Sequence, residues 1–399
     1  MTSLWLPHWP LQNNNFLTFG IILITGLIGG ALAHRIPYLP RLSGFLLIGF
    51  FLGPGFINLF QHDLIQQAQP FVHVALALIV FELGRQLDLK SLRPGLVAIS
   101  LAESALTFGL IYFILIKLGI PPLVSALAAA IGVSSSPAVV LLVMREYQAS
   151  GDVTSRNLDL VALNNIFSFL IFTALQPAAL QTGGHSLETA IGLPLYQMGI
   201  AIVQAYLVAK IMLFILHHLE TTESGQFCLL VGTIIVSVGL SQLMNSTMLF
   251  TLLSLGIFSR NLDKQEKIIQ VGLGHAQEAF YIIMFVIAGA SLHLNAFLTY
   301  SLMGASFVVC RFIAKSSLIM GGSRLMGLNI RQGMGLSLTL IPMAGMAIGL
   351  LNQSTRFSAQ IHDPLSAIVL SAIAVLEVIG PIVTVAGLKL AGEIERARF

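Results

Sequence analysis

Residues Ser134-Ser135-Ser136-Pro137 interrupt an apolar stretch that runs from 122 to 144. A proline inside a helix removes one backbone hydrogen bond and leaves a carbonyl group without its donor. In lipid, such a carbonyl must face protein or a wet cavity. The apolar stretch 332–351 is interrupted in a similar way, by Thr339-Leu340-Ile341-Pro342 and Gly345. Paired interruptions in the two halves of a chain indicate a transporter's substrate site, whereas a lone proline can be only a packing kink.

The composition places most of the chain in a lipid bilayer. Of the 399 residues, 56% are hydrophobic and only 9% are charged, whereas a soluble domain has about 25% charged residues. A transmembrane helix needs about 20 apolar residues. We therefore predict thirteen spans, at 15–33, 42–60, 70–87, 95–117, 122–144, 157–180, 192–216, 226–243, 246–259, 273–292, 297–320, 332–351 and 364–388.

Positive residues favour one side of these spans. The connections that follow odd-numbered spans hold most of the Lys and Arg, for example Arg85, Lys90 and Arg93, whereas the opposite side has only Lys117 and Arg356. Cytoplasmic loops of membrane proteins carry the excess of positive charge. We therefore predict an N-terminus outside and a cytoplasmic C-terminus. Because no targeting signal is visible, we expect a plasma (inner) membrane location.

Nothing in the sequence indicates an enzyme. It has no Gly-rich phosphate loop, no Cys/His cluster and no nucleophile–base set, which are common carriers of catalytic chemistry. His217, His218 and His275 lack the companions of a metal site. The basic residues mostly mark one membrane edge, so we expect no nucleic acid, no metal and no cofactor. Membrane lipid is the expected surrounding.

Six motifs follow one another in the order found in one family of membrane proteins. Together they resemble the helices of the monovalent cation:proton antiporter-2 superfamily, which includes sodium/proton exchangers and the membrane domain of potassium-efflux antiporters. The resemblance covers nearly the whole chain. The motifs are Arg35 to Gly55, Phe81 to Leu89, Ser134 to Val139, Gly289 to Leu292, Arg331 to Ala347, and Glu377 to Pro381.

The resemblance implies an all-α polytopic membrane protein with the sodium/proton-antiporter fold. That fold has thirteen transmembrane helices, inverted repeats and two crossed broken helices. We expect residues 1–399 to form one transmembrane domain, with a core bundle broken near 134–137 and 339–345, a dimerisation bundle, and no cytosolic regulatory domain. Family members are usually homodimers that exchange sodium or potassium for protons by an elevator-like movement of the core. A monovalent cation:proton antiporter is therefore the expected function.

The pair Asn164-Asn165 departs from the family pattern. The sixth helix of family members normally has an aspartate at the ion site, where this chain has asparagine. An amide oxygen can coordinate a cation, but an amide cannot release a proton. We expect both asparagines to line the site with Ser134, Ser135 and Ser136, whose hydroxyl and freed carbonyl groups could meet a cation. Hydrogen bonding between helices is the alternative role for the asparagines.

Glu103 is the predicted replacement for the missing acid. Its helix enters the membrane near Pro94, which puts Glu103 about 13 Å deep, and Asn165 lies about 12 Å deep when measured from Asn157. Side chains at matching depth can meet if their helices are neighbours. A charge at this depth costs several kcal/mol, so we expect Glu103 to carry the exchanged proton and attract a dehydrated cation. The alternatives are a fixed partner of Arg or Lys, or a permanently protonated core residue.

Arg311 and Lys315 lie one helical turn apart and therefore share a helix face. The resemblance implies that a basic residue here faces the unwound crossing. There it pairs with an acid or balances the negative ends of half-helices. Glu103 and Glu377 are the candidate acids, and we expect Glu377 to pair with Arg311 rather than to contact the ion. Snorkelling toward the cytoplasm is the alternative for Lys315.

Two other functions stay open because the ion-site aspartate is missing. One is a sodium-coupled transporter of an organic solute with the same fold, in which the asparagines hold sodium. The other is a transport-inactive sensor or assembly protein. Cation-dependent proton movement separates the predicted antiporter from both.

Overall fold

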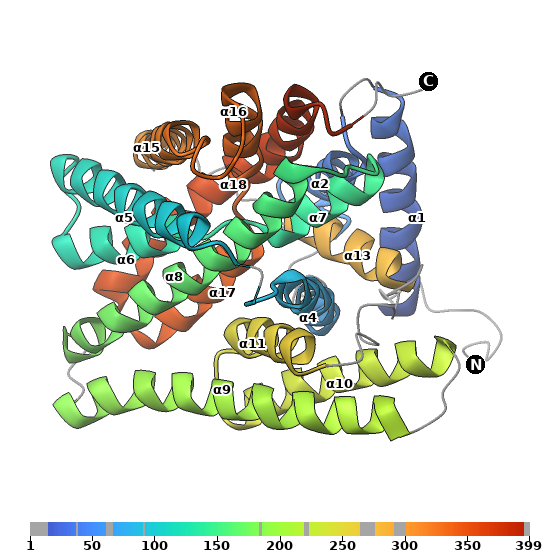
Figure 1. Ribbon diagram of the computed structural model, residues 1–399, viewed down its shortest axis with the longest axis horizontal. Coiled ribbons are helices and arrows are strands. Elements are labelled where there is room, and N and C mark those ends of the chain that lie inside the picture. Colours follow the sequence, from blue (N-terminus) through green and yellow to red (C-terminus); the bar gives the residue numbers. More distant parts are fainter. Residues whose placement is uncertain are drawn as a thin grey trace, which may run out of the picture.

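The computed structural model describes residues 15–36, 39–60, 67–90, 92–182, 186–218, 223–263, 276–290 and 301–394. Within these ranges the regular structure is entirely helical, as Figure 1 shows. The helices are α1 (Asn15–His34), α2 (Arg41–Leu52), α4 (Gln69–Gln86), α5 (Pro94–Lys117), α6 (Pro122–Val133), α7 (Pro137–Glu146), α8 (Asp152–Thr182), α9 (Leu187–His218), α10 (Glu223–Leu243), α11 (Met248–Leu262), α13 (Ala276–Ala290), α15 (Ser301–Gly321), α16 (Ile330–Thr339), α17 (Gly345–Gln353) and α18 (Ala359–Ala391), with the 3₁₀ turn η1 (Ser354–Arg356).

The predicted stretches coincide with these helices, and the all-helical fold is confirmed. Within the described ranges, seven helical spans are long and apolar enough to cross a membrane, whereas the full count of thirteen spans stays a prediction. The second stretch is shorter than predicted, because α2 ends at Leu52 and the following Gly53-Pro54-Gly55 cannot continue a helix. His275 and the Ser291-Leu292 part of one motif lie outside the described residues.

The two predicted breaks are confirmed. The fifth span divides into α6 and α7 around Ser134–Ser136, and the twelfth divides into α16 and α17 around 340–344. Pro137 occupies the first turn of α7, where its missing N–H costs nothing. The Ser136 hydroxyl caps the same helix by accepting a hydrogen bond from the Val139 amide at 3.4 Å. The second half-helix α7 therefore begins at a proline with a serine cap, and α17 begins at Gly345.

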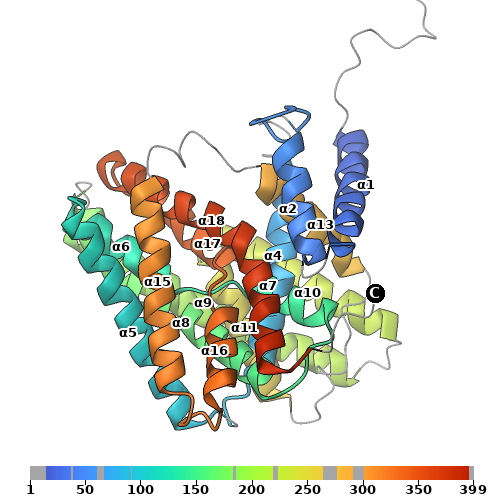
Figure 2. The ribbon, with the colours of Figure 1, turned by 90° about the horizontal axis from the view of Figure 1, so that it is seen from above.

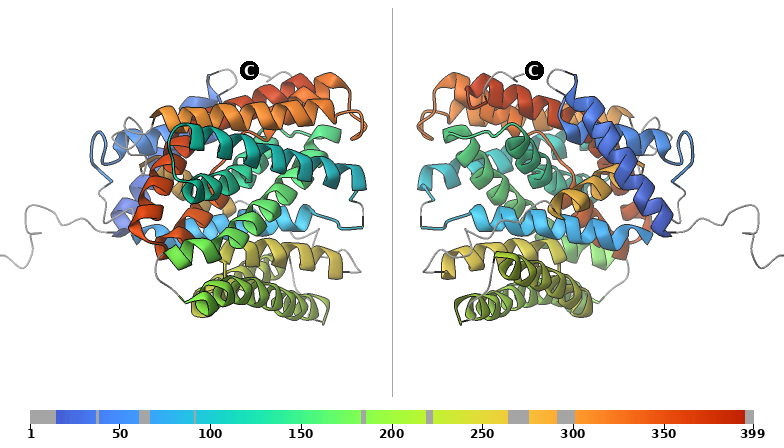
Figure 3. Two further views of the ribbon diagram at one scale, coloured as in Figure 1. Left: turned by 90° about the vertical axis from the view of Figure 1, so that its left-hand side faces the viewer. Right: turned by 90° about the vertical axis from the view of Figure 1, so that its right-hand side faces the viewer.

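The helices pack in two groups. In Figure 1 the first group lies toward the right and the bottom and the second toward the upper left, and Figure 2 shows α1 and α2 on the side opposite α5 and α15. In the first group α4 packs on α11, α2 packs on α1 and α13, and α9 packs on α10 and α11. In the second group α15 packs on α5 and α18, α16 packs on α18, and α6 packs on α5 and α8. Figure 3 shows α9 and α10 as an outer layer along one edge. Both broken helices belong to the second group, apart from α7, which also touches α4.

Two glycines let a broken helix approach its neighbour closely. A Cβ atom built on Gly335 of α16 would lie 2.6 Å from the carbonyl oxygen of Gly387 on α18, and the reciprocal distance is also 2.6 Å. Small residues at such crossings are the usual means of tight packing between membrane helices. The contact fixes α16 against α18 and thereby sets the position of the second break.

Helix α8 carries the two asparagines. Its N-terminus is bound by Glu393, which follows α18. The Glu393 carboxylate accepts hydrogen bonds from the Val153 amide at 2.6 Å and the Thr154 amide at 2.7 Å. Negative charge at a helix N-terminus is stabilising because it satisfies free amides and opposes the helix dipole. The contact therefore ties α8 to the segment after α18.

Candidate ion and proton site

The unwound segments of the two broken helices face each other. The amide of Ser136 donates a hydrogen bond to the carbonyl of Pro342 at 2.8 Å, and the hydroxyl of Ser135 donates to the carbonyl of Leu340 at 3.2 Å. These bonds satisfy backbone groups that the breaks release, as a lipid-embedded chain requires. The crossing lies in the protein interior, since Ser134, Ser135 and Ser136 are all buried.

Arg311 of α15 occupies the centre of this crossing. Its side chain is fully buried and makes no ion pair with any described residue. Its partners are carbonyl groups at the C-terminal ends of α6 and α16, where helix dipoles concentrate negative charge. The guanidinium donates hydrogen bonds to four carbonyl oxygens, those of Gly132, Leu340 (3.1 Å), Ile341 (3.3 Å) and Pro342 (3.4 Å). It also donates to the Ser135 hydroxyl at 3.4 Å.

Arg311 thus neutralises main-chain charge, and the predicted pairing of Arg311 with Glu377 is not found. Glu377 makes no hydrogen bond or ion pair with any described residue and instead lines a cavity on another side of α18. The physical reason is that five acceptors already surround the guanidinium, four of them carbonyls that the helix breaks release. A sequence gives the depth of Glu377 but not the side of α18 on which it points.

One turn from Arg311, Lys315 meets Glu103. The Nζ atom of Lys315 lies 2.7 Å from Oε1 of Glu103, and both side chains are 0% exposed. The same ammonium donates to the Val133 carbonyl at the end of α6, at 3.3 Å, and Thr107 donates to Glu103 Oε1 at 2.9 Å. The second carboxylate oxygen, Oε2, is buried and has no hydrogen-bond partner among the described residues. The Glu103–Lys315 pair therefore lies at the crossing, and Oε2 of Glu103 can still accept a hydrogen bond.

The two asparagines lie next to the same place. The Asn164 amide oxygen accepts from the Ser100 hydroxyl at 2.8 Å, and the Asn165 amide oxygen accepts from the Ser135 backbone amide at 3.0 Å. Both side-chain nitrogens are buried without a partner among the described residues. Each amide oxygen keeps a second lone pair. The asparagines therefore connect α8 to α5 and to the first break, and each can still accept one more bond.

The three serines of the first break have different surroundings. Ser135 contacts Asn165 with its amide and α16 with its hydroxyl. The Ser134 hydroxyl donates to the Ile131 carbonyl at 2.8 Å, within its own helix end, and the Ser136 hydroxyl caps α7. Ser135 is thus the serine whose hydroxyl reaches the other broken helix.

Residues on α5 that the sequence analysis does not single out complete the site. Ser100 and Thr107 lie one turn before and one turn after Glu103, on the same helix face, and both are buried. Their hydroxyls orient Asn164 and Glu103 respectively. The signal that would have found them is the spacing of three and four residues between polar groups in an otherwise apolar helix.

A further ion pair joins the two helix groups at one end of the molecule. Glu82 of α4 contacts Arg145 of α7 and lies 3.7 Å from Arg85 of its own helix. The Glu82 side chain is 4% exposed and the Arg145 side chain is 43% exposed. This pair crosses the boundary between the two groups.

Comparison with known proteins agrees with this architecture. The family described as "Sodium/hydrogen exchanger, transmembrane" matches residues 20–389. No protein of curated function matches significantly. The fold is similar to the sodium proton antiporter MjNhaP1 from Methanocaldococcus jannaschii at pH 8, with a TM-score of 0.69, 17% identity, and coverage of 94% of this chain and 95% of that chain. An electron-microscopy structure of the same antiporter gives a TM-score of 0.70, 17% identity, and coverage of 95% and 98%.

The family match spans nearly the whole length of the chain, and the solved structures have a similar overall fold. These are features of secondary transporters, and the prediction that the chain is not an enzyme is confirmed. The chain belongs to the transmembrane sodium/hydrogen exchanger family.

Proposed function

We propose that this protein exchanges a monovalent cation, sodium or potassium, for a proton at the Glu103–Lys315 pair. The observation that carries the proposal is the 2.7 Å contact between these two fully buried side chains, beside the end of α6. The family supplies the reaction class. The pair supplies a proton-binding group in a chain that has Asn165 where the usual aspartate is expected. Glu103 is the cation-attracting acid. The exchanged proton, which the sequence analysis assigns to Glu103, is held by Lys315 in this proposal, because the Lys315 ammonium contacts the Glu103 carboxylate at 2.7 Å.

The exchange keeps the charge of the site constant. In one state the Lys315 ammonium neutralises the Glu103 carboxylate. When the proton leaves Nζ, Lys315 becomes a neutral amine, and the carboxylate takes up one cation instead. A buried site with an uncompensated charge is strongly unfavourable, so the cation enters only as the proton leaves. One cation therefore enters the site for each proton that leaves it, which gives a stoichiometry of one proton for one cation in each cycle.

Neutral oxygens complete the proposed cation site. Glu103 Oε2 has no partner among the described residues, and the amide oxygens of Asn164 and Asn165 each have a free lone pair. Ser135, whose amide holds Asn165, places the first helix break beside them. Arg311 keeps the crossing together by occupying the carbonyls, and it takes no part in proton transfer.

Movement of the second helix group past the first is the proposed route of access. The second group carries both broken helices, whereas the first group of α1, α2, α4, α9, α10, α11 and α13 forms a continuous packing unit. We propose that the first group also joins two copies into a homodimer and that the second group moves as an elevator. The orientation that we infer from charge, with the C-terminus inside, puts the Glu82–Arg145 pair on the cytoplasmic side.

Reconstituted vesicles with a pH-sensitive dye inside test the proposal. Sodium, potassium and lithium are added outside in turn to vesicles with the wild type, Glu103→Gln or Glu188→Gln. Glu188 of α9 is exposed and far along the chain from the crossing, so its variant is a matched control. We expect cation-driven alkalinisation of the vesicle interior with the wild type and the control, and no pH change with Glu103→Gln.

A second variant distinguishes a loss of exchange from a folding defect. Glu103→Gln leaves Lys315 buried without a counter-charge, so the double variant Glu103→Gln/Lys315→Gln removes both charges together. It too should show no exchange, while its melting curve should be cooperative. Exchange at the wild-type rate in a folded double variant would show that another residue carries the proton. No proton movement by the wild type in any cation gradient would exclude antiport altogether.

A further inference from the structure

We propose that the cavity between the two helix groups binds a monovalent organic cation with an apolar body, and that Glu377 supplies its counter-charge. The cavity has a volume of about 330 Å³ and is lined by α4, α11 and α13 of the first group and by α17 and α18 of the second. That volume lies in the range of about 300–1,000 Å³ that is usual for small-molecule sites. The proposal is independent of the exchange reaction at Glu103.

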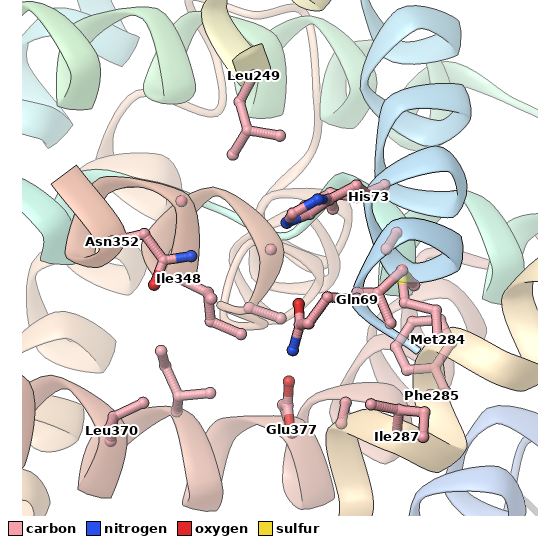
Figure 4. Close-up of a pocket in the computed structure, with 18 of the residues that line it drawn as sticks. Gln69, His73, Leu249, Met284, Phe285, Ile287, Ile348, Asn352, Leu370 and Glu377 are labelled. Carbon is pink, nitrogen blue, oxygen red and sulfur yellow. The ribbon is translucent and has the colours of Figure 1, made fainter. Parts of the chain in front are cut away.

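Glu377 is the charged group in this cavity wall. The residue is 3% exposed and makes no hydrogen bond or ion pair with any described residue. Figure 4 shows its carboxylate pointing into the space in front of Gln69 and His73 of α4. A buried carboxylate without a partner is costly and is commonly protonated instead, whereas a cation in the cavity would supply a partner that stabilises the ionised form. The charge of the site therefore selects for positive ligands.

The remaining wall is mostly hydrocarbon, which favours an organic cation over sodium or potassium. Among the described lining residues, the oxygen-bearing side chains besides Glu377 are Gln69, Asn352 and Ser371, and the Ser371 hydroxyl already donates to the Ile368 carbonyl at 2.8 Å. So few oxygens cannot replace the hydration shell of a small inorganic cation. The apolar body would instead lie against Val72, Leu76, Leu249, Phe285, Ile348 and Ile373.

The aromatic ring of Phe285 adds a second reason for an ammonium ligand. Phe285 is 2% exposed and lines the same cavity as Glu377. Ammonium groups are attracted to aromatic faces, and the attraction strengthens where water is excluded. Gln69 and Asn352 are exposed and mark the rim of the cavity. A ligand can therefore enter between α4 and α17 and place its charge at Glu377. A lipid chain in the same place would leave the carboxylate uncompensated.

Calorimetric titration of the purified full chain with benzyltrimethylammonium tests the site. This probe carries a permanent charge, so its own protonation does not complicate the result. We expect saturable binding to the wild type and binding at least roughly tenfold weaker to Glu377→Gln, which corresponds to the loss of one partly buried charge interaction. Neopentylbenzene, the uncharged carbon analogue of the probe, should bind the wild type more weakly by a similar factor.

Two further variants make the result specific. Ala374→Phe fills the cavity one turn from Glu377 without changing any charge, and it should abolish binding of the probe. The double variant Glu103→Gln/Lys315→Gln should bind the probe as the wild type does, although it loses exchange, so a failure here is distinguishable from a failure of the antiport proposal. Equal affinities of wild type and Glu377→Gln, equal affinities for the probe and its uncharged analogue, or no binding by the wild type would each overturn the inference.

Discussion

Nζ of Lys315 on α15 lies 2.7 Å from Oε1 of Glu103 on α5, and neither side chain reaches the surface. Two opposite charges in such a place lose hydration that is worth several kcal/mol for each ion, and their mutual attraction recovers this only while both are present. The folded protein is therefore stable while both charges are present, and it is destabilised when only one of them is removed. That property suits a site that passes between a proton-loaded and a cation-loaded state.

Removing one member of this pair should cost more stability than removing both. Glu103→Gln leaves an unpaired buried ammonium, for which we expect a loss of about 3–5 kcal/mol. The double variant Glu103→Gln/Lys315→Gln should recover much of that loss, because two neutral amides can hydrogen-bond to each other. Thermal unfolding of the wild type, the single variant and the double variant in the same detergent measures the order of their stabilities. A double variant that melts below Glu103→Gln would contradict the account of the pair.

The stability that Arg311 provides should depend on the shape of its guanidinium group as well as on its charge. The guanidinium reaches five acceptors at the crossing, whereas a lysine ammonium has only three donors. We expect Arg311→Lys to lower the melting temperature and Arg311→Gln to lower it further, since that variant also removes the positive charge of the guanidinium from the helix ends. Arg324→Lys, at an exposed position, is the matched control. A fully stable Arg311→Lys protein would show that charge alone suffices.

Restoring an acid at the asparagine pair should change the charge moved in each cycle. Asn165→Asp keeps an oxygen for the Ser135 amide, which lies 3.0 Å from the present amide oxygen, and adds a second proton-binding group. We expect wild-type sodium flux to be insensitive to an imposed membrane potential and flux of the variant to respond to it. Potential-dependent flux in vesicles measures this. A wild type that responds as strongly as the variant would refute one-for-one exchange.

The sequence predicts the breaks well because their causes are local. Proline and capping residues such as Ser136 and Pro137 act on their own helix, so their effect needs no knowledge of neighbours. The depth of a residue in the membrane also follows from counting residues along a helix, and Glu103 lies near the end of α6, where Lys315 contacts it. These two signals predict most of the architecture and the acid at the candidate site.

The partners of each side chain are less accessible from sequence. Arg311 and Glu377 both lie deep in their spans, yet one faces backbone carbonyls and the other faces a cavity. Which way a side chain points depends on helix rotation, and these helices are apolar on most sides, so no polar face indicates it. The carbonyls that hold Arg311 belong to apolar residues such as Leu340, whose side chains give no hint of the interaction.

Proton release from the purified protein is the most direct test of the Glu103–Lys315 exchange. Saturating sodium or potassium is added to a weakly buffered detergent solution, and a dissolved pH indicator counts the protons released. The account predicts about one proton per chain from the wild type and from Glu188→Gln, and none from Glu103→Gln. Equal proton release from Glu103→Gln and the wild type would contradict it.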